Sequence, residues 1–290
     1  MTELVVISGK GGTGKTTVVG SFAALAEGAV VADCDVDAAD LHILLGGEVV
    51  EKLPYHGSEA AVIDGEKCIA CGACAQVCRF DAVRTEGGIY AVDPLSCEGC
   101  GACAYVCPVG AISMEERRSG WIYVSRTPYG TLVHGELLPG EENSGKLVTQ
   151  VKMRARDIAR KEGASLLLID GSPGIGCPVI ASLSGAHAAL IVAEPSLSAL
   201  HDLSRVAGVA RHFRSRLFLV LNKADLSPKL AEEIREAAGR EGMEYLGEIP
   251  YDERVTAAQL AGRPVAIDSH GPASRALREL WEKLRAALAD

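Results

Sequence analysis

Residues 9–17 read GKGGTGKTT, which satisfies the phosphate-binding pattern G-x-x-x-x-G-K-[ST]. The glycines of this loop allow backbone N–H groups to turn towards phosphate oxygens, and a following helix presents its positive N-terminal end. We expect Lys15 to neutralise the β- and γ-phosphates of a nucleotide and Thr16 to place its hydroxyl on Mg²⁺. A glycine-rich turn that binds nothing is the alternative, but the loop lies between an apolar run and a helical pattern, as the motif requires. The predicted phosphate-binding residues are Gly11, Gly12, Thr13, Gly14, Lys15, Thr16 and Thr17.

Eight of the ten cysteines fall in two short runs, and only Cys34 and Cys177 lie outside them. Both runs have the spacing C-x2-C-x2-C-x3-C, which resembles that of bacterial two-cluster ferredoxins. In that pattern the fourth cysteine of each run binds the cluster held by the other run. The resemblance therefore implies two 4Fe-4S clusters, one on Cys68, Cys71, Cys74 and Cys107, and one on Cys97, Cys100, Cys103 and Cys78. Zinc bound by isolated cysteine pairs, or disulfides, are the alternatives.

The elements that position these residues follow a strand–helix–strand rhythm. Short Val/Ile/Leu runs without polar alternation predict parallel strands buried on both faces, at 4–7, 30–32, 166–169, 189–192 and 217–221. Helical patterns lie between them, at 17–26, 152–161, 200–213 and 228–241. Right-handed crossovers then give an α/β fold with a doubly wound, mostly parallel sheet of the P-loop NTPase type.

One segment breaks this rhythm and predicts an inserted α+β ferredoxin-like domain. Residues 64–113 hold eight cysteines and an internal repeat with a period of 29 residues, in which 67–83 is echoed by 96–112. The flanking segments, 1–63 and 114–290, form the two parts of the predicted P-loop ATPase domain. Residues 117–150 are rich in Gly, Glu and Ser, and we expect strands or a mobile loop there.

Composition limits the class of protein and its partners. A chain of 290 residues with 48% hydrophobic and 23% charged residues is typical of a globular protein, and a formal charge of -9 disfavours nucleic-acid binding. The first apolar run has only four residues, too few for a signal-peptide core or a membrane span. We therefore expect a cytoplasmic protein, whose thiols stay reduced.

A second lysine in the phosphate-binding loop carries a family resemblance. Lys10 gives the deviant Walker pattern K-G-G-x-G-K-[ST]-[ST], so the chain resembles the MinD/ParA ATPases, a family that includes the nitrogenase iron protein. The resemblance implies an ATP-dependent dimer, either a homodimer or a heterodimer with a related ATPase, in which Lys10 reaches the partner's ATP. It also implies that Asp35 positions the attacking water and that Asp170 binds Mg²⁺ through a water molecule.

The base-recognition residues leave a choice between ATP and GTP. NKAD at 222–225 matches the strand ending of P-loop proteins, where the Asp pairs with guanine in GTPases and the Asn contacts adenine in MinD-like ATPases. A downstream strand end that contains Pro250 resembles the element that covers adenine in the second group. We favour ATP, with Asn222, Lys223 and Pro250 as the predicted base-binding residues.

Two features carry further alternatives. Cys177 lies seven residues after Asp170, the offset of a cluster ligand in the nitrogenase iron protein, so it is either a ligand or a plain thiol that lines the switch. The helical pattern at 274–289 has one apolar face. It packs against the sheet or, as in MinD itself, binds a membrane surface; its acidic residues favour packing.

The two resemblances together predict a nucleotide-gated dimer that couples ATP hydrolysis to electron transfer through two 4Fe-4S clusters, with a redox partner protein. Two other functions remain possible from the sequence. The chain could assemble or deliver clusters as cargo, or it could act as a MinD-like regulatory switch that senses redox state through them.

Overall fold

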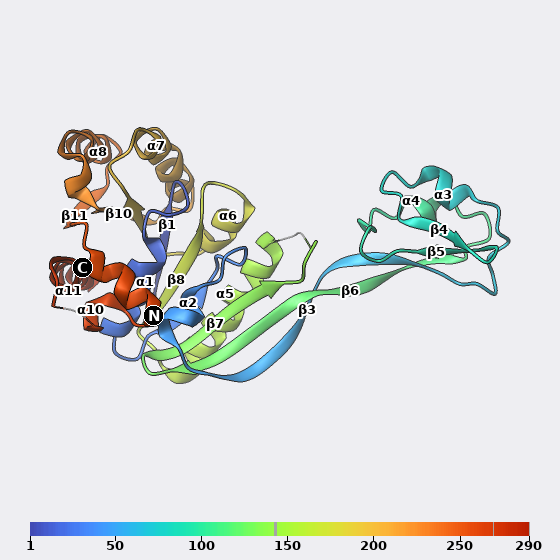
Figure 1. Ribbon diagram of the computed structural model, residues 1–290, viewed down its shortest axis with the longest axis horizontal. Helices are drawn as coiled ribbons and strands as arrows, with labels where there is room; N and C mark the ends of the chain where they lie inside the picture. The colour runs from blue at the N-terminus through green and yellow to red at the C-terminus, as the bar shows by residue number, and fades with distance from the viewer. Residues whose placement is uncertain (142–143, 269, 290) are drawn as a thin grey trace. The chain divides into compact units, whose positions relative to one another are not determined.

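The computed structural model describes residues 1–141, 144–268 and 270–289. They form two compact units (Figure 1), one made of Met1–Leu53, Ile122–Glu136 and Ser144–Asp290 (unit 1) and one made of Pro54–Trp121 and Leu137–Asn143 (unit 2). Strands β3 (Glu48–Ile63) and β6 (Ile112–Thr127) contribute residues to both units. The predicted insert, residues 64–113, lies inside unit 2, which begins at Pro54.

A nine-stranded sheet has the order β11-β10-β9-β1-β8-β2-β7-β6-β3. All pairings from β11 through to β7 are parallel, which confirms the mostly parallel α/β prediction. The strands not yet bounded are β1 (Thr2–Ser8), β2 (Val30–Asp33), β7 (Gly130–Leu137), β8 (Leu166–Pro173), β9 (Ala188–Ala193), β10 (Arg216–Asn222) and β11 (Glu244–Ile249). Strands β6 and β7 and the start of α5 occupy the segment 117–150, so strands and a helix are found there; its residues 142 and 143 lie outside the described residues.

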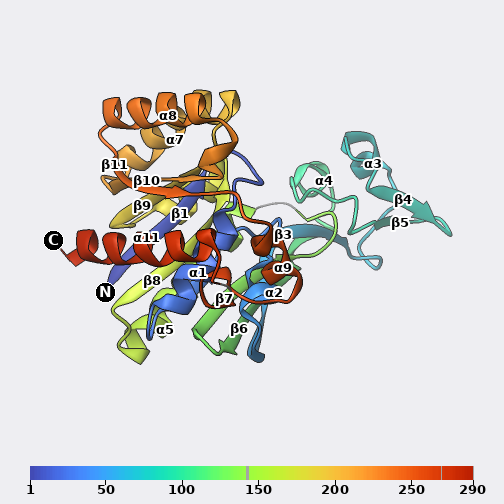
Figure 2. The same cartoon turned by 60° about the vertical axis from the view of Figure 1, so that its left-hand side comes forward.

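Helices cover both faces of the sheet in unit 1 (Figure 2). Leu4 and Val6 of β1 face one core, in which Phe22 of α1 and Trp281 of α11 have ring centroids 5.3 Å apart. Val5 and Ile7 are also fully buried but lie outside that core, because successive side chains of a strand point to opposite faces. The helices of unit 1 are α1 (Lys15–Leu25), α2 (Leu41–Leu45), α5 (Ser144–Glu162), α6 (Cys177–Leu183), α7 (Leu197–His212), η1 (Ala224–Leu226), α8 (Pro228–Arg240), α9 (Glu253–Leu260), α10 (Val265–Asp268) and α11 (Pro272–Ala289).

The last helix packs on the sheet, as its apolar face predicts. Its apolar side chains are buried in the same core as Leu4 and Val6 of β1. They are those of Leu277, Leu280, Trp281 and Leu284. Within the described residues, no helix combines the length and the apolar character needed to cross a bilayer.

Three neighbouring strands bring the candidate nucleotide-binding residues together. Strands β1, β8 and β2 are adjacent and parallel, so their carboxyl ends meet at one edge of the sheet. The phosphate-binding loop follows β1, Cys34 and Asp35 follow β2, and Asp170 lies within β8 near its end. Open α/β sheets bind ligands at this edge.

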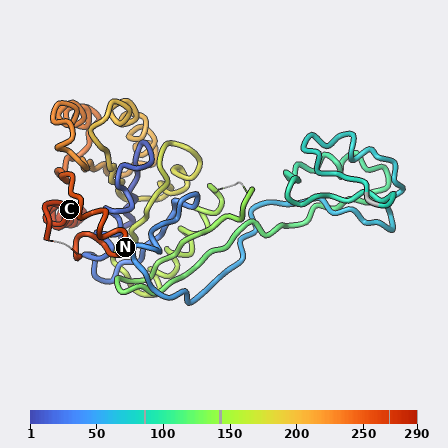
Figure 3. Tube along the Cα trace, in the orientation of Figure 1, coloured from blue at the N-terminus to red at the C-terminus, as the bar shows by residue number. Residues whose placement is uncertain are grey.

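Unit 2 repeats in three dimensions what its sequence repeats (Figure 3). It holds α3 (Ala73–Val77), α4 (Ala102–Val106) and the antiparallel strands β4 (Val83–Glu86) and β5 (Ile89–Val92). Gly72 and Gly101 precede the two helices with φ of 78° and 72°, a left-handed conformation that favours glycine. The N–H of Asp64 donates to the carbonyl of Ala111 at 2.8 Å, and the N–H of Asp93 donates to that of Ala82 at 2.7 Å. Each half of the repeat therefore closes on the other through matching bonds.

Candidate functional site

The loop between β1 and α1 lines a cavity of about 690 Å³, into which Lys15, Thr16, Asp35 and Ser172 also face. Gly14 has φ of 91°, and a Cβ there would lie 2.1 Å from Nδ2 of Asn222. Only glycine fits such a position, since any side chain would strain the backbone and collide with the amide. The loop and Asn222 therefore depend on each other for their shape.

Lys15 connects the loop to the two strands beside it. Its ammonium group pairs with Oδ1 of Asp170 and, at 3.3 Å, with Oδ2 of Asp35. Burial works against the charged form of Lys15, but the carboxylates of Asp170 and Asp35 outweigh it and raise the pKa of the lysine. The lysine, a general phosphate ligand, thus remains positively charged.

Asp170 has one carboxylate oxygen that is buried and unpaired among the described residues. Its side chain is fully buried, and its Oδ2 has no hydrogen-bond partner among the described residues. Buried polar atoms are normally paired, so an unpaired one in a binding site indicates a missing ligand or water. Carboxylate and hydroxyl oxygens suit Mg²⁺, so Asp170 and Thr16 fit the ion that accompanies a nucleotide.

Asp33 holds the segment that carries Asp35. Its two carboxylate oxygens accept hydrogen bonds from the N–H groups of Asp35 and Leu41, both at 3.1 Å. Burial, followed by the nearby charge of Asp170, raises the pKa of Asp33 well above its ordinary value. Burial also raises the pKa of Asp35, against the lowering effect of Lys15. The charge of Asp170 therefore acts on Asp33, its register partner across β8 and β2.

Lys10 pairs with a carboxylate at the end of β9. Its ammonium group lies 2.7 Å from Oε1 of Glu194, while Lys223 approaches Oε2 of the same residue at 3.3 Å. The Lys223 ammonium also donates to the carbonyl of Gly12 at 3.3 Å. Glu194 therefore connects Lys223 to Lys10 of the phosphate-binding loop.

The predicted base-binding residues do not line the phosphate cavity. Asn222 donates from Nδ2 to the carbonyl of Thr13 at 2.8 Å, so its amide supports the loop. Pro250 lies on the strand end after β11, and the next N–H, that of Tyr251, donates to Oδ1 of Asp225 at 2.7 Å. The structure thus joins the NKAD segment to the Pro-containing segment, and their contact with a base stays a prediction.

Sequence reasoning missed two residues of this site. Glu194 directly follows the buried strand β9, and its place at a strand end is the signal that could have found it. Gln259 of α9 lines the cavity and donates from Nε2 to Oγ1 of Thr17 at 2.8 Å. No motif marks Gln259, since only the fold brings α9 against α1.

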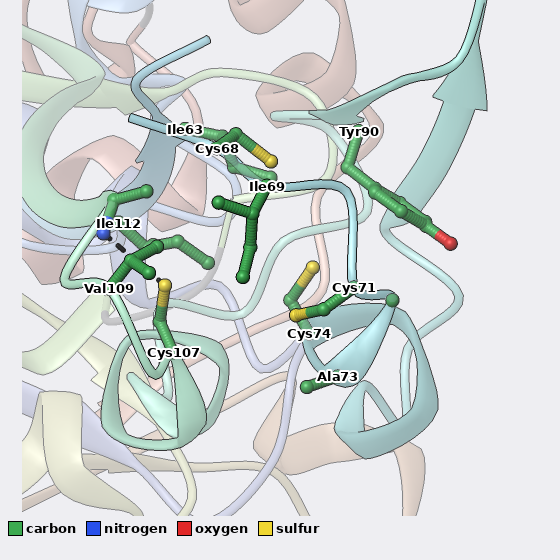
Figure 4. Close-up of a pocket in the computed structure, with 12 residues that line it drawn as sticks. Ile63, Cys68, Ile69, Cys71, Ala73, Cys74, Tyr90, Cys107, Val109 and Ile112 are labelled. Carbon is green, nitrogen blue, oxygen red and sulfur yellow. Dashed lines mark hydrogen bonds between the residues drawn. The ribbon is translucent and has the colours of Figure 1, made fainter. Parts of the chain in front are cut away.

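In unit 2 the eight clustered cysteines line two pockets. The first cysteine pocket (Figure 4) contains Cys68, Cys71, Cys74 and Cys107 among its lining residues, and the second contains Cys97, Cys100, Cys103 and Cys78. Each pocket thus takes three cysteines from one run and the fourth from the other. The N–H of Ala111 donates to Sγ of Cys107 at 3.2 Å, the kind of contact that backbone groups make to cluster thiolates.

The donor set of each pocket fits the predicted group. Four thiols line each pocket, three from one run and one from the other, and four cysteine thiolates are the ligands of a 4Fe-4S cubane. Within the described part of the chain, no three His, Cys, Asp or Glu side chains are arranged to share a single ion.

The two remaining cysteines lie in unit 1. Cys34 is fully buried, and burial raises the pKa of its thiol far above the ordinary range. Cys177 is the first residue of α6 and is exposed. Nothing in the described residues pairs the two, and a ligand role for Cys177 stays a prediction.

Comparison with known proteins matches residues 4–265 to the model of the CobQ/CobB/MinD/ParA nucleotide binding domain. A protein of Methanocaldococcus jannaschii described as uncharacterized is 33% identical over 98% of this chain and 96% of its own length. The iron-sulfur cluster carrier protein of Pyrococcus abyssi is 26% identical over 97% of this chain and 85% of its own.

Solved structures share the fold. The cell division ATPase MinD of Pyrococcus furiosus superposes with a TM-score of 0.59 at 18% identity, covering 99% of both chains. The Cyanothece McdA(D38A)–ATP complex gives a TM-score of 0.61 at 17% identity, covering 98% of this chain and 96% of that one. At these identities the likeness concerns the fold alone.

Proposed function

The chain belongs to the CobQ/CobB/MinD/ParA family of nucleotide-binding proteins, and we propose that it is an Mg²⁺-dependent ATPase that couples ATP to electron transfer through two 4Fe-4S clusters. The observation that carries the proposal is the crossed cysteine set, with three thiols of one run and the fourth of the other around each pocket. A cargo site that loads and releases a cluster does not need two closed sets of four ligands. Permanent clusters supply one-electron chemistry.

On the nucleotide side, the proposed mechanism begins with competition for Lys15. Phosphate oxygens of ATP compete with Asp35 and Asp170 for the same ammonium group, so binding releases both carboxylates. Thr16 and, through a water molecule, Asp170 would hold Mg²⁺, and the ion would supply positive charge that offsets the charge developing on the phosphates. Asp35 orients the attacking water in line with the γ-phosphate.

ATP is favoured over GTP by the contact of Asp225. In GTPases with the N-K-x-D pattern this carboxylate pairs with guanine, but here it accepts the N–H of Tyr251 at 2.7 Å. That bond supports the hypothesis that Asn222 contacts adenine and that the Pro250 segment covers the ring. Competition of GTP and ATP for binding tests it.

Sheet connectivity supports coupling between the nucleotide and the cysteines. Asp33 ends β2, which pairs with β7, and β7 neighbours β6 in the sheet. Strand β6 supplies Ile112 to the first cysteine pocket and Met114 to the second. A shift of the segment around Asp35 on ATP binding can therefore reach the cysteines through two adjacent strands. The family resemblance adds a dimer in which Lys10 acts on the partner's nucleotide.

The deciding experiment is anaerobic purification with iron, sulfide and ATPase assays, followed by a redox titration with ADP and with an ATP analogue. We expect eight iron atoms per chain, from two clusters of four. We also expect the rate at which the reduced clusters pass electrons to an acceptor to differ between the nucleotides. Rates that are the same with ADP, with the analogue and without nucleotide contradict coupling.

Delivery of clusters to other proteins is a second candidate, because the similarity to the Pyrococcus abyssi iron-sulfur cluster carrier covers 97% of this chain. The same anaerobic preparation tests it. Transfer of a cluster to an apo-ferredoxin within minutes favours delivery, whereas retention of both clusters favours electron transfer.

A further inference from the structure

Twelve lining residues of each cysteine pocket correspond at the 29-residue offset of the sequence repeat, and Met114 of the second pocket has no counterpart in the first. Ile63 corresponds to Val92, Val109 to Phe80 and Ile112 to Val83, and all six are apolar. Two corresponding positions differ in polarity: Ile69 of the first pocket stands where the second has Glu98, and Tyr90 stands where the second has Ala61. The pockets are therefore alike in shape but not in chemistry.

Glu98 is the one charged residue among the described residues that line either pocket. Its side chain is exposed, as is that of Ile69, and each of the two residues follows the first cysteine of its run. Within the described part of the chain, no ion pair involves the Glu98 carboxylate. Its charge therefore acts on the second pocket without a neutralising partner.

Two ion pairs lie near the second pocket, and Arg79, which follows Cys78, is exposed and lines neither pocket. Arg117 donates to the carbonyls of Pro94 and Cys97, but its guanidinium lies 2.9 Å from Glu141. Arg84 lies 3.2 Å from Asp93 in the same way. Since opposite charges at such distances largely cancel at the cluster, Glu98 remains the charge that distinguishes the two pockets.

We propose that Glu98 holds the cluster of Cys97, Cys100, Cys103 and Cys78 at a lower reduction potential than the cluster of Cys68, Cys71, Cys74 and Cys107. This inference rests on the proposed function, because it requires both clusters. Reduction adds one negative charge to a cluster, and a neighbouring carboxylate raises the free energy of that reduced form. Ile69 has no such effect on the first cluster.

The test exchanges the two residues in the full-length protein. Anaerobic redox titrations, followed by electron paramagnetic resonance, compare the wild type with Glu98→Gln and Ile69→Glu. We expect the titration of the wild type to show two reduction waves, one for each cluster. Glu98→Gln raises the lower wave, so that the ratio of reduced to oxidised cluster at a fixed potential grows about threefold, whereas Ile69→Glu depresses the upper wave by a similar ratio.

Two variants serve as controls. Glu66→Gln removes the same charge from an exposed position that lines neither pocket, and we expect it to move both waves less than Glu98→Gln moves one. Tyr90→Phe removes the hydroxyl that has no counterpart in the second pocket and leaves the lower wave in place.

The inference fails if the wild type gives a single wave, if Glu98→Gln moves neither wave, or if Glu98→Gln and Ile69→Glu move the same wave. Iron content separates these results from a failure of the proposed function. A protein without iron refutes the clusters themselves, whereas eight iron atoms with unshifted waves refute only the role of Glu98.

Discussion

Lys15 shares its ammonium group between two acids that the proposed mechanism assigns to different tasks. Asp170 is buried and keeps one oxygen for a metal-bound water, while Asp35 is partly exposed and lies at the cavity. Both carboxylates pair with the same ammonium group. A phosphate that binds Lys15 therefore changes the surroundings of both acids at once. Metal binding and water positioning are thereby linked to a single event.

Asp35→Asn is expected to lower kcat for ATP hydrolysis by roughly 10²-fold or more, because the amide cannot orient the attacking water as a carboxylate does. Nucleotide affinity should stay equal or rise, since an uncharged amide competes less well with phosphate for Lys15. Steady-state hydrolysis and equilibrium binding measure the two quantities. Asp37→Asn is the matched control, because Asp37 lines the same cavity but is exposed and makes no ion pair with Lys15. An unchanged kcat in Asp35→Asn would refute its role.

Glu194→Gln should release Lys10 and so favour the dimer in which that lysine reaches the partner's nucleotide. The Lys10–Glu194 pair is partly exposed, so its loss is worth at most about 1 kcal/mol. We therefore expect ATP-dependent dimers at an about fivefold lower protein concentration, measured by analytical ultracentrifugation. Glu241→Gln, which breaks the surface pair with Arg211, should leave dimerisation unchanged. Weaker dimerisation of Glu194→Gln would show that Glu194 acts in the dimer instead.

Motifs predicted those residues whose chemistry depends on sequence spacing. Lys15, Asp35 and Asp170 meet as expected because β1, β2 and β8 lie side by side in the sheet. The loop after β1, the segment after β2 and Asp170 of β8 therefore share one edge. Glu194 and Gln259 could not be predicted in the same way, since their contacts depend on where β9 and α9 lie in the fold. Asn222 was expected to contact the base, but its amide nitrogen bonds the carbonyl of Thr13, and its role in base binding stays a prediction.

At the scale of elements, an aromatic stack connects α2, β7 and β6 beside the segment that carries Asp35. His134 lies between His42 and Tyr123, with ring centroids 4.8 Å from each. Burial, and then the neighbouring His42, lowers the pKa of His134 to about 4. Because the folded protein disfavours the imidazolium form, this stack holds the histidine neutral.

Acid should therefore destabilise unit 1 through His134. Above its ordinary pKa of 6.5 the side chain is neutral in both folded and unfolded chains, so it has no effect there. As the pH falls from 6.5 towards 4, the unfolded chain binds a proton that the folded chain does not, and stability falls. Between pH 7 and pH 5 the loss amounts to at most about 2 kcal/mol.

His134→Phe keeps a flat ring in the stack and removes the titration. We expect its melting temperature to fall less than that of the wild type between pH 7 and pH 5. His212→Gln changes an exposed histidine and should keep the pH dependence of the wild type. If His134→Phe and the wild type lose the same number of degrees, the acid sensitivity comes from other groups.

Strand and helix positions followed closely from the sequence, because buried parallel strands appear as unbroken apolar runs. All five predicted runs lie in the sheet, and the predicted helices overlap α1, α5, α7 and α8. The long strands β3 and β6 were harder to predict, because much of their length is exposed and carries no clear apolar pattern. For the same reason, the predicted insert at 64–113 is shorter than the segment Pro54–Trp121 of unit 2, which begins earlier in the chain and ends later.

At the scale of the whole molecule, the proposed coupling requires that the nucleotide-bridged dimer, in which Lys10 reaches the partner's nucleotide, alters the clusters. Lys10→Ala tests this requirement, because Lys10 lies at the nucleotide site and far along the chain from every clustered cysteine. We expect nucleotide binding to persist, since the phosphate-binding loop keeps Lys15. ATP hydrolysis should fall roughly 10²- to 10³-fold, as on loss of a charge that stabilises the transferring phosphate in trans.

The decisive comparison is the rate at which reduced clusters pass electrons to an acceptor, measured with ADP and with an ATP analogue. The recovery of the visible absorbance as the clusters are oxidised follows this rate. In the wild type the two nucleotides should give different rates, and in Lys10→Ala the same rate, because the variant cannot complete the nucleotide-bridged dimer. Iron content must equal that of the wild type, so that the difference cannot come from lost clusters. A nucleotide effect that survives in Lys10→Ala would place the coupling within one chain, along the adjacent strands, and would separate it from dimerisation.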